Sequence, residues 1–215
     1  MTTGILERPA PQTGGPKGPE HPLPPDGGGD GPTPDPRGLL GDPTRFGLLA
    51  FLGTVSMLFI GFTSAFILRR ASADWRSFTA PPALWLNTAL LLTSSVTLEG
   101  ARRRLRDWDL RGAQTFVAIT GVLGLSFLLG QLLAWRQLAQ SGLFLSTNPS
   151  SSFFYLLTGI HGLHLLGGLL WFAAIFVRVT RLALTPGQDG LRLFATYWHF
   201  LDALWLYLVL LLFVY

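Results

Sequence analysis

Three histidines and one aspartate stand out because they lie in otherwise apolar stretches near the end of the chain. His161 and His164 are three residues apart, and so are His199 and Asp202. Residues i and i+3 share a helix face, so each pair points to one side of its segment. Imidazoles backed by a carboxylate can ligate a metal ion or haem, and they can also join helices by hydrogen bonds. We favour an interhelical polar cluster without metal, because the glycines around His161 and His164 allow close helix packing.

A second polar set lies on one stretch in the middle of the chain. Small hydroxyl and amide side chains hold apolar helices together and can also line a water path, and packing is the favoured interpretation. The carboxylate at the end of this set is expected to pair with a neighbouring arginine, and a proton-relay role is the alternative. The members are Asn87, Thr88, Ser94, Ser95, Thr97 and Glu99.

Four arginines follow this stretch directly. Near a membrane surface each arginine contributes about 1 kcal/mol to the binding of anionic lipid head groups. We therefore expect possible lipid contacts at Arg102, Arg103, Arg104 and Arg106.

Several classes of chemistry find no support in the sequence. The chain has no cysteine, which excludes thiolate metal sites and a cysteine nucleophile. It contains no G-x-S-x-G, H-E-x-x-H or Walker motif, so no catalytic residue is assigned. The positive net charge of +4 suits cytoplasmic membrane loops better than nucleic acid, which is not expected as a partner.

The composition indicates an integral membrane protein. Of 215 residues, 49% are hydrophobic and 13% are charged, against about 25% charged in an average soluble domain. Residues 1–44 hold most of the prolines and lack an apolar period, so this segment is predicted to be a disordered cytoplasmic tail. Residues 45–215 form the predicted membrane domain.

Five apolar runs follow the tail. Most exceed the roughly 20 residues that cross a bilayer, and the second does so only with the flanking residues 82 and 99–101. Backbone groups in lipid must pair within their own segment, so the predicted fold is an all-α bundle of five transmembrane helices. The runs are 46–68, 83–98, 113–135, 153–177 and 193–215.

The distribution of arginines predicts the orientation. With the N-terminus inside, ten of the arginines between residues 37 and 192 lie on the cytoplasmic side and four lie outside. The positive-inside rule therefore places the N-terminus in the cytoplasm and the C-terminus outside. The expected location is a plasma membrane of the bacterial type.

Four short motifs, in this order along the chain, carry a resemblance to a known family. They are G-F with A-F at 61–66, L-N-T with S-S-V-T at 86–97, T-G-I-H-G-L-H at 158–164, and Y-W-H-F-L-D-A-L-W-L at 197–206. Together they resemble subunit III of the haem–copper cytochrome c oxidases, in its five-helix form. Members often carry a membrane-embedded glutamate six residues before the G-F motif, where this chain has Val55.

The resemblance implies an accessory subunit of an aerobic oxidase that passes electrons from cytochrome c to oxygen and translocates protons. Such a subunit packs on subunit I, shares its complex with subunit II, binds phospholipid, and supports proton uptake and stability. Haem and copper then belong to the partner subunits, and this chain holds no cofactor of its own. The alternatives are the matching subunit of a quinol oxidase or a nitric oxide reductase, and a stand-alone membrane protein that binds haem or metal.

Overall fold

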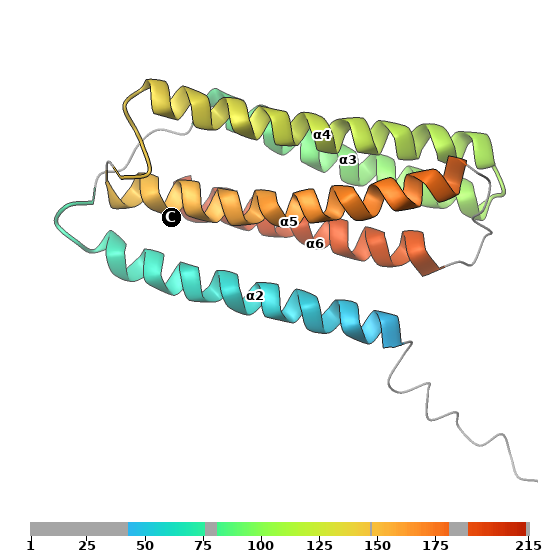
Figure 1. The fold of residues 1–215 in the computed structure, drawn as a ribbon, viewed down its shortest axis with the longest axis horizontal. Coiled ribbons are helices and arrows are strands. Elements are labelled where there is room, and N and C mark those ends of the chain that lie inside the picture. The colour runs from blue at the N-terminus through green and yellow to red at the C-terminus, as the bar shows by residue number, and fades with distance from the viewer. Residues whose placement is uncertain (1–42, 76–80, 147, 181–188, 214–215) are drawn as a thin grey trace, which may run out of the picture. The chain divides into compact units, whose positions relative to one another are not determined.

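Five long α-helices follow one another along the chain, and no strand occurs among the residues that the structure describes (Figure 1). The computed structural model describes residues 43–75, 81–146, 148–180 and 189–213. Most of the predicted disordered tail, residues 1–42, lies outside these ranges, whereas residues 43 and 44 are helical. The helices are α2 (Pro43–Arg70), α3 (Pro82–Arg106), α4 (Leu110–Gln140), α5 (Pro149–Thr180) and α6 (Asp189–Phe213).

Four of these helices are long and apolar enough to cross a membrane. In α2, α4, α5 and α6 the most apolar window has a mean hydropathy between 1.5 and 2.0. Helix α3 is more polar, but its 25 residues span roughly 37 Å, enough for a hydrocarbon core of about 30 Å. It includes Pro82 and residues 99–101, the flanks that the sequence analysis required. The predicted all-α membrane bundle of five helices is confirmed.

Helices α3, α4, α5 and α6 form a four-helix bundle in which each helix contacts the next and α6 returns to contact α3. Helix α2 lies beside this bundle, against α5 and α6 (Figure 1). Consecutive helices are joined by short connections and run antiparallel, as expected for a chain that repeatedly crosses a bilayer. Helix α6 lies next to α3. This contact brings the motif at 197–206 together with the motif at 86–97.

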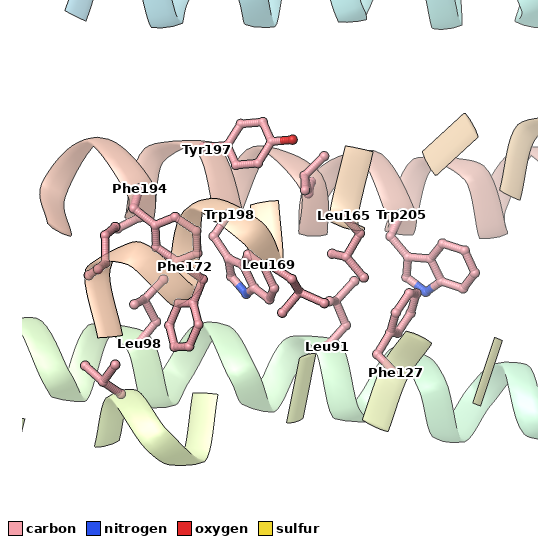
Figure 2. Close-up of a cluster of buried hydrophobic side chains, with 14 of the residues drawn as sticks. Leu91, Leu98, Phe127, Leu165, Leu169, Phe172, Phe194, Tyr197, Trp198 and Trp205 are labelled. Carbon is pink, nitrogen blue, oxygen red and sulfur yellow. The ribbon is translucent and has the colours of Figure 1, made fainter. Parts of the chain in front are cut away.

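Aromatic side chains fill the centre of the bundle. Figure 2 shows Trp198 near Phe172 and Phe194, and the ring centroids of Trp205 and Phe127 lie 4.9 Å apart, edge to face. Trp198 and Trp205 are almost fully buried. Lipid is as apolar as these side chains, so burial alone does not hold transmembrane helices together, and close packing and hydrogen bonds must do so.

The turn between α3 and α4 is fixed by a capping aspartate. Asp109 accepts a hydrogen bond of 2.9 Å from the backbone N–H of Gly112, which satisfies a free donor at the start of α4. Its second oxygen accepts a hydrogen bond of 2.7 Å from Arg104. The Gly112 N–H bond, followed by the Arg104 bond, lowers the pKa of Asp109 below its ordinary value of 3.8.

This cap predicts a pH dependence of stability. Because folding lowers the pKa of Asp109, its ionised form stabilises the fold near neutral pH, and this contribution is lost as the pH falls from 3.8 through the lower folded value. Asparagine still caps a helix but does not titrate. We expect the unfolding temperature of Asp109→Asn to lie below that of the wild type at pH 7 and to approach it near pH 3. A difference that is the same at both pH values would contradict this assignment.

Candidate functional site

The polar side chains of α3 and α6 meet along one line, which we call the α3–α6 seam: Thr88, Ser94, Ser95, Trp198, His199, Asp202 and Trp205. At its centre Ser95 bonds to two residues of α6. Its hydroxyl lies 2.8 Å from Nδ1 of His199 and donates a hydrogen bond to Oδ2 of Asp202. A hydroxyl has one hydrogen, so Ser95 accepts from the Nδ1–H of His199.

Two tryptophans of α6, one before His199 and one after Asp202, extend the seam. Trp198 Nε1 donates to the Ser94 hydroxyl at 2.9 Å, and Trp205 Nε1 donates to the Thr88 hydroxyl at 3.1 Å. Trp198 and Trp205 are seven residues apart, two helical turns, so they lie on the same face of α6. A buried indole N–H needs a partner, and α3 supplies one at each position.

The seam resembles a hydrolase triad in residue types but not in geometry. In a catalytic triad the carboxylate holds the histidine, and the histidine accepts the proton of the serine. Here Ser95 lies between the other two, because it contacts both His199 and Asp202. The serine hydrogen is directed to the carboxylate, so the imidazole is not placed as its base. This arrangement joins helices and does not activate a nucleophile.

The two histidines of α5 lie apart from the seam. His161 is fully buried between the rings of Phe127 and Trp205, at centroid distances of 6.1 and 5.1 Å. Neither of its ring nitrogens has a hydrogen-bond partner in the described part of the chain. His164 Nδ1 lies 2.8 Å from the carbonyl of Ile160, one turn earlier. The structure thus brings His199 and Asp202 together through Ser95, and it places His161 and His164 in separate environments.

A metal ion would need several ligands at one point. No group of three histidine, aspartate or glutamate residues that could hold a metal occurs within the described ranges. His161 contacts the ring of Trp205 on α6, and His164 lies 6.2 Å from the ring of Phe59 on α2. The imidazoles of α5 therefore point into aromatic packing and not toward a shared centre.

Two other polar residues of α3, Asn87 and Thr97, face α4. Asn87 Nδ2 donates to Gln131 Oε1 at 3.4 Å, and the hydroxyls of Thr97 and Thr120 lie 2.8 Å apart. Gly130 allows this approach, because a Cβ there would lie 2.0 Å from Oδ1 of Asn87. One helix thus distributes its polar residues between two neighbours.

The charged end of α3 is held by ion pairs. Glu99 lies 2.6 Å from Arg102 and 3.7 Å from Arg103, so it forms the predicted ion pair with a neighbouring arginine. Arg104 pairs with Asp109 at 2.7 Å. Arg106 is exposed. The guanidinium of Arg103 is also largely exposed, with 72% of its side chain accessible.

Sequence reasoning missed several interhelical bonds made by aromatic residues. Trp135 Nε1 donates to Thr158 at 3.1 Å, which joins α4 to α5. Tyr197 donates to the carbonyl of His164 at 2.7 Å and joins α6 to α5, and the hydroxyls of Tyr207 and Thr63 lie 2.7 Å apart. The available signal was the presence of N–H and O–H groups within apolar helices, where each must find a partner.

Comparison with known proteins places these motifs in one family. Residues 40–215 match the family model for cytochrome c oxidase subunit III. A relative from Mycobacterium tuberculosis named "Probable cytochrome c oxidase subunit 3" is 33% identical over 170 residues, which cover 74% of this chain and 82% of the relative. The "Cytochrome c oxidase subunit 3" of Synechocystis sp. is 32% identical over 184 residues, covering 80% of this chain and 76% of the relative. The chain with the α3–α6 seam therefore belongs to the cytochrome c oxidase subunit III family.

Proposed function

We propose that this chain is a non-redox accessory subunit of an aerobic haem–copper oxidase that passes electrons from cytochrome c to oxygen and translocates protons. The α3–α6 seam is the observation that carries this proposal. The motif residues of α6 form hydrogen bonds with α3, of 2.8 to 3.1 Å from His199, Trp198 and Trp205. Residues used in this way position helices. Cytochrome c as the electron donor is supported by the names of the relatives.

The proposed partners are subunit I, by direct packing, and subunit II in the same complex, and these carry the haem and copper. Large apolar side chains on the outer faces, such as Leu68 and Met57 with 79% and 77% exposure, suit lipid and neighbouring subunits.

Purification tests the proposal directly. A tagged chain should bring down larger subunits that contain haem and copper and oxidise cytochrome c with oxygen. Separated from them, the chain should be colourless. A chain that purifies alone with a haem spectrum would instead support the stand-alone haem protein.

Proton uptake and lipid binding are the finer parts of the proposal. Glu99 is partly exposed at the end of α3, and Ser95 lies one turn before it, in contact with His199 and Asp202. These groups form a line of titratable and hydroxyl side chains from the helix end into the bundle, which supports a role in proton uptake. The exposed parts of Arg103 and Arg106 are the proposed lipid contacts of the cluster Arg102, Arg103, Arg104 and Arg106, since a guanidinium has five N–H donors and one ion pair leaves others free.

The proposed location is a bacterial-type plasma membrane with the α3–α4 turn inside. The natural chain has no cysteine, so single cysteines report orientation without background. We expect Ser141→Cys, in the α4–α5 loop, to react with a membrane-impermeant maleimide on intact cells. Asp107→Cys, in the exposed α3–α4 turn, should react only after the membrane is opened. The reverse pattern would invert the proposed orientation.

A further inference from the structure

A groove of about 830 Å³ lies between α4 and α5, near the end of α4 and the start of α5. Its walls include the rings of Trp135 and Tyr155 and, deeper along α5, Gly159, Ile160 and Leu163. Arg136 is also part of the lining. The groove is at the opposite end of α4 from Arg102–Arg106, so it is separate from the arginine cluster discussed above.

The polar atoms of the aromatic walls are already bonded within the protein. Trp135 Nε1 donates to Thr158 at 3.1 Å. The hydroxyl of Tyr155 lies 2.9 Å from the carbonyl of Leu143 and 3.2 Å from that of Trp135, both of which can accept its hydrogen. The two side chains therefore offer only their rings to an occupant, and the body of the groove is apolar.

Arg136 is the one charged residue among those described as lining the groove. It is exposed, and no carboxylate in the described ranges pairs with it, whereas Glu99, Asp74 and Asp109 pair with other arginines. It lies four residues before the end of α4, where a 31-residue helix has passed the roughly 20 residues that cross the hydrocarbon core. A free cation thus stands at the interface above an apolar groove.

We propose that this groove binds an anionic phospholipid, with its phosphate on Arg136 and an acyl chain along Gly159, Ile160 and Leu163. The match is one of shape and charge, because a phospholipid also has an anionic head at the interface and an apolar chain below it. A guanidinium binds phosphate through paired N–H donors. A partner helix in the same groove would have to bring a carboxylate to Arg136. The site deepens the lipid-binding part of the proposed function.

A second groove between the same helices provides an internal comparison. It has a volume of about 410 Å³ and is lined by apolar residues that include Gly121, Phe172 and Ala173. No charged residue is among its described lining residues. A lipid chain could enter either groove, but only the groove at Arg136 should distinguish anionic from zwitterionic head groups.

The test is native mass spectrometry of the assembled complex after its bound lipids have been exchanged for phosphatidylglycerol or for phosphatidylcholine. The spectra report how tightly each lipid is retained. We expect the wild type to retain phosphatidylglycerol about fivefold more tightly at one site, the effect of one arginine near the membrane surface. Arg136→Gln should abolish this preference. Gly159→Leu should reduce retention of both lipids, because it fills the groove.

Three variants serve as controls. Arg178→Gln removes an exposed arginine elsewhere, and Ala173→Leu adds volume in the second groove, so both should keep the preference. Gly159→Ala should keep the fold, since its Cβ would lie 3.6 Å from Trp135, an ordinary contact.

An unchanged preference in Arg136→Gln would overturn the inference, and so would a resolved map with a partner helix in the groove. The same spectra report subunit composition. A chain that fails to associate with redox subunits counts against the proposed function, whereas an associated chain without lipid preference counts against the groove alone.

Discussion

Replacing Asp202 by leucine should weaken the association of α3 with α6 and lower the yield of assembled complex. The substitution removes the acceptor of the Ser95 hydrogen bond, and Ser95 also holds His199. Leaving a buried donor without its acceptor costs about 1–3 kcal/mol, so we expect a loss of about 2 kcal/mol in the free energy of unfolding. Thermal unfolding of the detergent-solubilised protein and the recovery of assembled complex measure this loss.

Two further variants distinguish the loss of the Ser95–Asp202 hydrogen bond from the change in side-chain shape. Asp202→Asn keeps an oxygen that accepts from Ser95 and should recover most of the stability. Ser95→Ala removes the other partner, so its effect should not add to that of Asp202→Leu. The complexes that do assemble should retain oxygen consumption. A fully assembled Asp202→Leu complex without oxygen consumption would show that the aspartate has a role in the chemistry.

The second large effect is expected at Gly168 of α5, where the backbone lies against the ring of Tyr197 from α6. A Cβ at this position would lie 2.8 Å from Cε1 of Tyr197, closer than real Cβ contacts allow. The tyrosine ring cannot yield easily, because its hydroxyl donates to the carbonyl of His164 at 2.7 Å. We expect Gly168→Ala to lower the free energy of unfolding by about 1–3 kcal/mol, the usual cost of overpacking.

The neighbouring glycine supplies the matched control. A Cβ at Gly167 would meet nothing within 4 Å in the described structure. Alanine favours the helix over glycine by about 1 kcal/mol, so Gly167→Ala should be neutral or stabilising. Thermal unfolding of the two variants side by side measures the difference. Equal effects at the two positions would mean that the α5–α6 contact is looser than described.

The helices could be predicted from the sequence because membrane insertion depends on length and hydropathy. The exception is α3, because its apolar run of 83–98 is shorter than a membrane span. The structure extends it to Pro82–Arg106, since its polar residues face α4 and α6 and not lipid. A hydropathy scale treats every polar side chain as unfavourable in the membrane, whether or not it is hydrogen-bonded to a neighbouring helix. The length of a polar helix inside a bundle is therefore underestimated from composition alone.

The contacts of the site were harder to predict than its residues. The i, i+3 spacing correctly placed His199 and Asp202 on one side of α6, but nothing in the spacing identified Ser95 as the residue between them. The same spacing in α5 put His161 and His164 on a shared face, yet one contacts Trp205 and the other lies near Phe59. A helix face is wide enough for two neighbours, and only the tertiary arrangement decides between them.

The groove at Arg136 shows the same limit for a binding surface. Its walls come from two helices and the connection between them. The sequence does not indicate that the polar atoms of Trp135 and Tyr155 are hydrogen-bonded within the protein, away from the groove. Arg136 itself was visible as a charge at the end of an apolar run. That it lacks a carboxylate partner among the described residues depends on the fold.

We propose that the histidines of α5 and α6 serve helix packing, through a hydrogen bond at His199 and ring contacts at His161 and His164, and ligate neither iron nor copper. The most direct measurement is the iron and copper content of the purified complex, with its haem spectrum, for His161→Phe and His199→Leu beside the wild type. We predict unchanged metal per assembled complex and unchanged haem bands, together with a lower unfolding temperature for His199→Leu. The loss of one haem or one copper in either variant, with all subunits still present, would contradict the account.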